Sequence, residues 1–139
     1  MKRTNDVTVI ETEKNDSPFG EVISSYSRAQ AIEDGFLVDV SKLAQEAGFK
    51  YPVAITVEAF AAVEVPEGME KFGQDLTGRL WDVFTMLKNG IRSSQGDTVL
   101  FTVLFQNKPR RMTEKKFKSI CSGGDNGEPV ITLMNVDQD

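Results

Sequence analysis

VISSYSRAQAIEDGFLVDVSKLAQEAGFKYPVAITVEAFAAV, residues 22–63, alternates apolar runs with helix start and stop signals more regularly than the rest of the chain. Ser27 and Gln30 match a capping box, in which each side chain satisfies a backbone N–H of the other residue, so a short helix is predicted to begin at Arg28. Gly35 offers the left-handed conformation that ends a helix. This part of the chain therefore opens with one short helix.

The same stretch then predicts strands and further short helices in alternation. The run Phe36–Val40 alternates at period two and predicts a strand, and Val53–Ile55 predicts an extended segment or a brief strand. Ser41 and Thr56 are placed to cap the helices that follow, and Gly48 ends the first of these. Helices this short are not stable alone in water, so each is expected to pack against a sheet.

The second half of the chain predicts the longest helix and the longest strand. Apolar residues recur at spacings of three and four, which predicts a helix that begins near Met69 or Asp75 and ends at Asn89-Gly90. The run Asp97–Phe105 has apolar residues on both faces. That pattern is typical of a central strand covered on each side.

A C-terminal hairpin completes the predicted fold. Lys118–Cys121 and Val130–Val136 are joined by the turn signal Gly123–Gly127, which favours two antiparallel strands. The fold class is therefore α+β, a single domain whose mixed or antiparallel sheet packs against several short helices and one longer amphipathic helix. Residues 1–18 are predicted to be a mobile tail, and residues 19–136 are predicted to form the domain.

Composition excludes several kinds of chemistry. The 139 residues include no histidine, which removes Ser-His-Asp, Cys-His and zinc-histidine sites. Cys121 is the one cysteine, so an intrachain disulfide is also excluded. No apolar run is long enough to span a bilayer, and the formal net charge is −5. We expect a cytoplasmic protein with no membrane contact, no metal site and no cofactor.

Two segments invite a ligand-binding interpretation. Lys108–Lys118 carries six positive side chains and one acidic one, Glu114, which is enough to contact several phosphates of a nucleic acid if these side chains share a face. A solvated hairpin loop is the favoured alternative. Ser122–Gly127 is rich in glycine but lacks the lysine and the following helix of a phosphate-binding loop, so a hairpin turn is favoured there as well.

Polar residues of the first segment form the other candidate site. Glu33 and Asp34 lie near a predicted helix C-terminus and oppose its dipole, so they need a partner such as Arg28 or a function. Asp39 is the one charged residue of its predicted strand. With the basic segment included, the candidate binding residues are Arg28, Asp34, Asp39, Lys108, Arg110 and Arg111.

The runs Tyr26–Val40, Ala47–Phe49 and Pro52–Thr56, with Gly124–Thr132 near the C-terminus, resemble a family of small uncharacterised bacterial proteins carried on phages, plasmids and integrative elements. The resemblance implies an accessory protein of a mobile element. The resemblance carries over no established activity and no site residue. Our leading hypothesis is a non-enzymatic protein that binds or inhibits a macromolecule, with a protein as the expected partner.

The predicted order of strand, short helix and glycine-terminated turn from Ile23 to Leu37 is similar to the start of ADP-ribosyltransferase-like folds. This similarity implies a nucleotide-binding domain, with Arg28 and Glu128 as its polar participants. The chain lacks histidine and a recognisable catalytic glutamate motif, so we lean towards a protein that is not an enzyme. Binding of nucleic acid through residues 108–118 is the third hypothesis.

Overall fold

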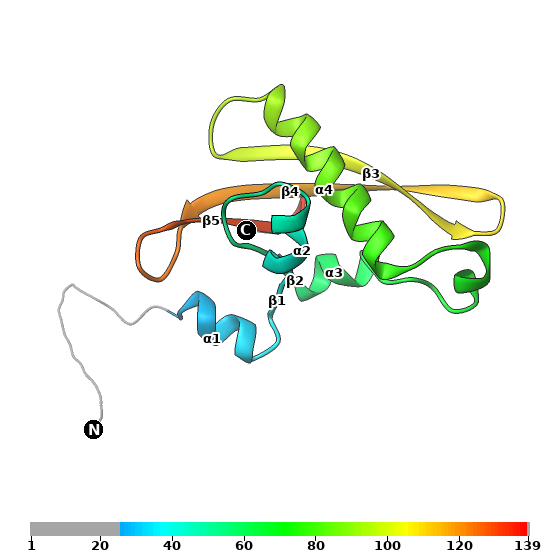
Figure 1. Ribbon diagram of the computed structural model, residues 1–139, viewed down its shortest axis with the longest axis horizontal. Coiled ribbons are helices and arrows are strands. Elements are labelled where there is room, and N and C mark those ends of the chain that lie inside the picture. Colours follow the sequence, from blue (N-terminus) through cyan, green and yellow to red (C-terminus); the bar gives the residue numbers. More distant parts are fainter. Residues whose placement is uncertain (1–25, 139) are drawn as a thin grey trace. The chain divides into compact units, whose positions relative to one another are not determined.

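The computed structural model describes residues 26–138 (Figure 1), so the predicted tail, residues 1–18, lies outside the described part. The chain divides into two units between Gln30 and Ala31. Before the division, the Ser27 hydroxyl accepts a hydrogen bond of 3.0 Å from the Gln30 backbone N–H. Helix α1, Arg28–Glu33, begins at the predicted residue.

The described residues after Gln30 contain a five-stranded mixed sheet with the order β1-β2-β5-β4-β3. Strands β2 and β5 are parallel, and every other neighbouring pair is antiparallel. The predicted α+β class and the C-terminal hairpin, β4–β5, are therefore confirmed. The strands are β1 Leu37–Asp39, β2 Val53–Thr56, β3 Thr98–Lys108, β4 Arg111–Gly123 and β5 Pro129–Asn135.

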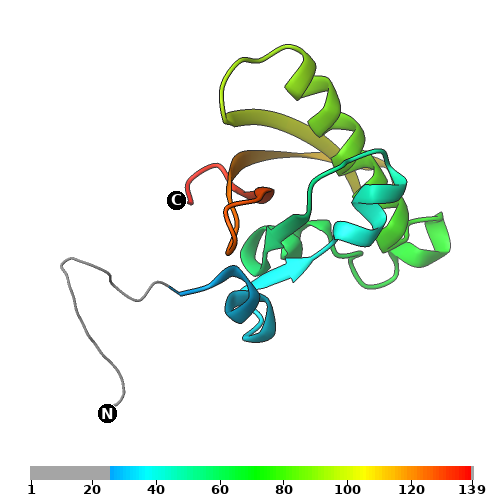
Figure 2. The same ribbon diagram turned by 60° about the vertical axis from the view of Figure 1, so that its left-hand side comes forward.

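The short helices and one long helix pack on the sheet and form a single hydrophobic core with it. Buried side chains of α2, α3 and α4 pack with inward-facing residues of β2, β3, β4 and β5. Figures 1 and 2 show the long helix α4 lying against β3. The helical elements are α2 Ser41–Glu46, α3 Val57–Val63, the 3-10 helix η2 Met69–Phe72 and α4 Leu76–Arg92.

The long strand exists as predicted, but its predicted central position is wrong. Strand β3 lies at an edge of the sheet and pairs with β4 alone among the described strands. Its burial alternates: Val99 and Phe101 are buried, whereas Leu100 and Leu104 are 67% and 53% exposed. Apolar residues on both faces predicted a strand with both faces buried, yet the two leucines face away from the core.

The predicted helix caps at Ser27 and Thr56 are confirmed, and the one at Ser41 is wrong. Thr56 Oγ1 accepts a hydrogen bond of 3.2 Å from the Ala59 N–H, which caps α3. The Asp75 carboxylate caps α4, at one of its two predicted starts. The Ser41 hydroxyl caps no helix; it accepts a hydrogen bond from the Val53 N–H at 3.0 Å and donates one to the Val53 carbonyl at 3.2 Å. Ser41 therefore ties the start of α2 to strand β2.

The predicted end of the long helix at Asn89-Gly90 is also wrong, since α4 continues to Arg92. Gly90 serves a packing purpose instead. A Cβ atom at this position would lie 2.9 Å from Val99 Cγ1 of β3, which is closer than such atoms pack. The glycine lets the helix backbone approach the strand. Strand β4 likewise begins earlier than predicted, at Arg111 instead of Lys118.

Replacing Ser41 with alanine is expected to lower the free energy of unfolding by about 1–3 kcal/mol, because it leaves the N–H of the fully buried Val53 without its hydrogen-bond partner. Urea denaturation of the purified protein measures the change. Ser94→Ala, at an exposed position, is the matched control and should shift the value by less than about 0.5 kcal/mol. Equal effects of the two substitutions would contradict the role given to Ser41.

Candidate functional site: the open edge of β3 and the basic hairpin

The six predicted binding residues come from several different elements of the chain. Arg28 lies in α1, before the division of the chain, and Asp34 lies just after that helix. Asp39 lies in β1, where its Oδ1 accepts a hydrogen bond of 3.0 Å from the Ser41 N–H. This is a local contact at the start of α2. The other three residues lie together at the turn between β3 and β4, and β1 and β3 are the opposite edges of the sheet.

Glu128, the acidic residue of the transferase-like hypothesis, also makes a local contact. Its carboxylate accepts a hydrogen bond of 2.9 Å from the Asn126 N–H in the turn between β4 and β5. In that turn the Gly127 N–H donates to the Gly124 carbonyl at 3.0 Å. The glycine-rich segment is therefore the hairpin turn that the sequence favoured.

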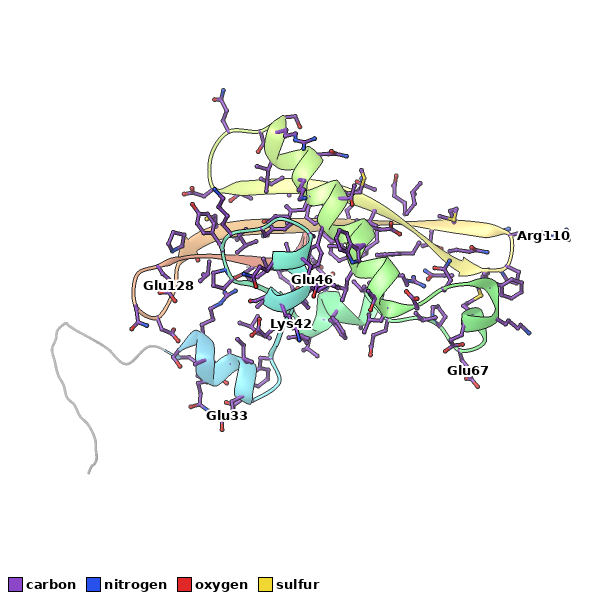
Figure 3. All side chains as sticks on the ribbon, viewed as in Figure 1. Glu33, Lys42, Glu46, Glu67, Arg110 and Glu128 are labelled. Atoms are coloured by element: carbon purple, nitrogen blue, oxygen red, sulfur yellow. The ribbon has the colours of Figure 1, made fainter. Side chains whose placement is uncertain are left out.

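The tip of the β3–β4 hairpin is strongly basic. Lys108, Pro109, Arg110 and Arg111 are exposed and line an open hollow of about 400 Å³. Figure 3 shows Arg110 at the far end of the hairpin. Residues 108–118 hold six of the sixteen Lys and Arg residues of the chain but one of its 21 Asp and Glu residues. The hairpin is thus a local positive surface on an acidic protein.

The outer face of this hairpin combines apolar and charged side chains. Leu100 pairs with Lys118 across the two strands, and Leu104 pairs with Glu114. Met112, 55% exposed, lies next to the basic tip. Cross-strand partners project from the same face of a sheet, so the leucines lie among charged side chains on a surface that α4 does not cover.

The free side of β3 carries a shallow groove. No other strand of residues 26–138 pairs with this side, so its backbone N–H and C=O groups have no partner strand within the described chain. A hollow of about 270 Å³ runs beside it, lined by Asp82, Thr85 and Met86 of α4 and by residues 102–104 of β3. Sequence reasoning missed this feature because it placed β3 inside the sheet.

Arg79, near the start of α4, is a buried cation that the sequence did not single out. It is 2% exposed, and its guanidinium lies 4.5 Å from the centre of the Phe105 ring. Its Nη2 donates to Asn107 Oδ1, at the place where the β3–β4 pairing is interrupted by a bulge. A bulge redirects a side chain. Here it directs Asn107 towards the arginine.

The rest of the Arg79 guanidinium lacks hydrogen bonds. Its Nε and Nη1 are buried and have no partner. Desolvation lowers the pKa of Arg79, and the negative charge of Asp82 partly offsets this effect. Arg79, Asp75 and Asp82 line a hollow of about 220 Å³. The two carboxylates there disfavour a further anion, so we interpret Arg79 as a structural cation close to the tip of the hairpin.

The described residues provide no group of three or more His, Cys, Asp or Glu side chains arranged to hold a metal ion. Among the helices in residues 26–138, none has both the length and the apolar character needed to cross a membrane.

Residues 16–139 match a family of unknown function, DUF6573, and the chain belongs to this family. No curated protein and no solved structure matches the chain.

Replacing Arg79 with methionine is expected to leave the free energy of unfolding unchanged or to raise it by about 1 kcal/mol, because an apolar side chain of similar length removes two buried, unpaired nitrogens. Asn107→Ala should lower it by about 1–3 kcal/mol, since it removes the hydrogen-bond partner and keeps the buried charge. Urea denaturation compares both variants. A large loss of stability in Arg79→Met would show that the cation stabilises the fold.

Proposed function

We propose that this protein is a non-enzymatic protein-binding protein, and that it binds an extended segment of its partner along the open edge of β3. The observation that carries the proposal is the combination, on one strand, of an eleven-residue edge with no partner strand among residues 26–138, a groove beside it and two exposed leucines. An added strand would form main-chain hydrogen bonds with β3, and pockets beside an edge select its side chains.

The edge itself supports this proposal. Natural proteins protect exposed edge strands with charges, prolines or bulges, because an open edge pairs with other chains. In β3 the irregularity lies only at the end, between Gln106 and Lys108, and the run Val99–Phe105 contains neither a charge nor a proline. An unprotected stretch of this length is typical of a surface that a partner covers.

The charges of the hairpin favour an acidic partner. Arg110 and Arg111 at the tip and Lys116 on the outer face are exposed. Complementary charge raises the rate of association and fixes orientation more than it raises affinity. Arginine and methionine are also enriched in protein interfaces, and Met112 lies beside the two arginines. We therefore propose a partner segment that combines apolar side chains with acidic neighbours.

The biological setting is part of the proposal. The sequence resemblance implies an accessory protein of a phage, plasmid or integrative element, and the sequence predicts a cytoplasmic location. A small protein that covers part of a host or element-encoded protein would act as an inhibitor without any catalytic group. Membership in a family of unknown function is compatible with this role.

Nucleic acid is the second candidate partner. A two-stranded β-ribbon with basic side chains fits the width of the DNA major groove, and the β3–β4 hairpin is such a ribbon. Leu100 and Leu104 argue for a protein instead, because phosphate contacts do not require apolar side chains in the middle of the surface.

The substitution Leu104→Lys distinguishes the two candidate partners, because it should change their binding affinities in opposite directions. Leu104→Lys should weaken binding of a protein segment about tenfold or more, because it places a charge where an added strand would pack an apolar side chain. The same substitution should leave nucleic-acid binding unchanged or strengthen it. Affinity capture with mass spectrometry identifies partners, and isothermal titration of each purified pair measures affinity.

Val136→Lys is the matched control, since it changes another exposed aliphatic residue, 44% exposed, outside β3. It should leave the affinity of the captured partner within about twofold of wild type. Two results together would favour nucleic acid over a protein partner. No captured protein would lose binding in Leu104→Lys, and retention of DNA or RNA would increase in the same variant.

Reversing the charge at the tip, with Arg110→Glu and Arg111→Glu together, should slow association with the acidic partner about tenfold and flatten its salt dependence, with a smaller change in dissociation. Surface plasmon resonance between about 50 and 300 mM salt, a range over which the Debye length falls from about 14 to about 6 Å, measures both rates. Lys42→Glu, on the exposed side of α2, changes the net charge by two units against four for the double reversal and should have little effect on the association rate. An unchanged association rate would remove the hairpin tip from the interface.

A further inference from the structure

A separate hollow lies away from β3, at the C-terminal end of α4. Its volume is about 470 Å³, which lies within the range of small-molecule sites. The loop between α2 and β2 forms one wall, the last turns of α4 form the other, and β5 contributes one apolar residue. The lining residues are Gly48, Phe49, Lys50, Tyr51, Lys88, Ile91, Arg92 and Ile131.

The charge of this hollow is one-sided. Lys50, Lys88 and Arg92 line it, and none of its described lining residues is Asp or Glu. This is unexpected on a chain with more acidic than basic residues. Three cations that share one hollow repel one another, and an anion with more than one negative charge would relieve the repulsion.

Local packing holds Lys88 in place. Its Nζ lies 5.8 Å from the centre of the Phe49 ring, within the range of a cation–π contact. The φ of Gly48 is +104°, a conformation that favours glycine. A Cβ atom there would lie 2.9 Å from this Nζ, so the loop packs closely against the ammonium group at the hollow.

A structural explanation accounts for only part of the arrangement. Cations in the last turn of a helix stabilise its dipole, which explains Arg92 and, more weakly, Lys88. Lys50 belongs to a different segment and gains nothing from the dipole. The explanation also leaves the exposed Tyr51 ring at the same hollow unassigned.

We propose that this hollow binds a small organic phosphate that carries a flat ring, the chemistry of a nucleotide. The three cations contact the phosphate groups, and the Tyr51 ring, 47% exposed, packs against the planar part of the ligand. Ile91 and Ile131 supply the apolar floor. The site is distinct from the groove beside β3, because the two share no lining residue and β3 contributes none to the hollow.

Isothermal titration of the full chain with ADP, adenosine and inorganic phosphate tests the ligand class. ADP should bind, and both fragments should bind at least about tenfold more weakly, because each supplies half of the contacts. Equal binding of inorganic phosphate and ADP would overturn the role of the ring. Absence of ADP binding would overturn the proposal as a whole.

Variants test the location. Lys50→Ala and Arg92→Ala should each weaken ADP binding about tenfold, the loss expected for one charge-assisted contact, and Tyr51→Ala should weaken ADP binding without changing phosphate binding. Lys42→Ala removes an exposed lysine that does not line the hollow and should have no effect. Denaturation curves confirm that each variant folds. If ADP binds equally well to all three variants and to the wild type, the ligand lies elsewhere and the proposal is overturned.

Discussion

The packing of α4 on β3 is the contact on which the rest of the structure depends. Phe101 of β3 stacks on Phe117 of β4 with ring centres 5.6 Å apart, and Phe105 meets the same ring edge-on at 6.4 Å. Helix α4 covers these rings, and Gly90 lets its last turns approach the strand. Side chains of α2 and α3 belong to the same core as those of α4. The outer face of β3 is uncovered, since Leu100 and Leu104 on that face are exposed.

This one-sided core explains why the proposed binding surface is a strand and not a cleft. A sheet buried on one face presents alternate residues to the other side. In β3 the buried set is entirely apolar, and the exposed set includes two leucines that no described residue buries. The hairpin then carries the positive charge beyond the core at Arg110 and Arg111. Apolar contact and charge therefore occur on one continuous element.

Local signals in the sequence predicted most elements, because they depend on neighbouring residues. The caps at Ser27 and Thr56 and the turn before β5 are of this kind. Ser41 misled because a serine before an apolar stripe resembles a cap, whereas its hydroxyl bonds a residue twelve positions away. The order of strands is similarly non-local. An apolar Leu100 has the same appearance in the sequence whether a helix or solvent lies above it.

Arg79 and the cationic hollow were beyond sequence reasoning for the same reason. Arg79 occurs in an amphipathic helix where an arginine normally reaches solvent, and only the bulge at Asn107 and the Phe105 ring explain why it is buried. A buried cation with unpaired nitrogens lowers stability. Its contacts with Phe105 and Asn107 lie near the tip of the hairpin, so the helix that lines the groove beside β3 also contacts the strand close to its basic end.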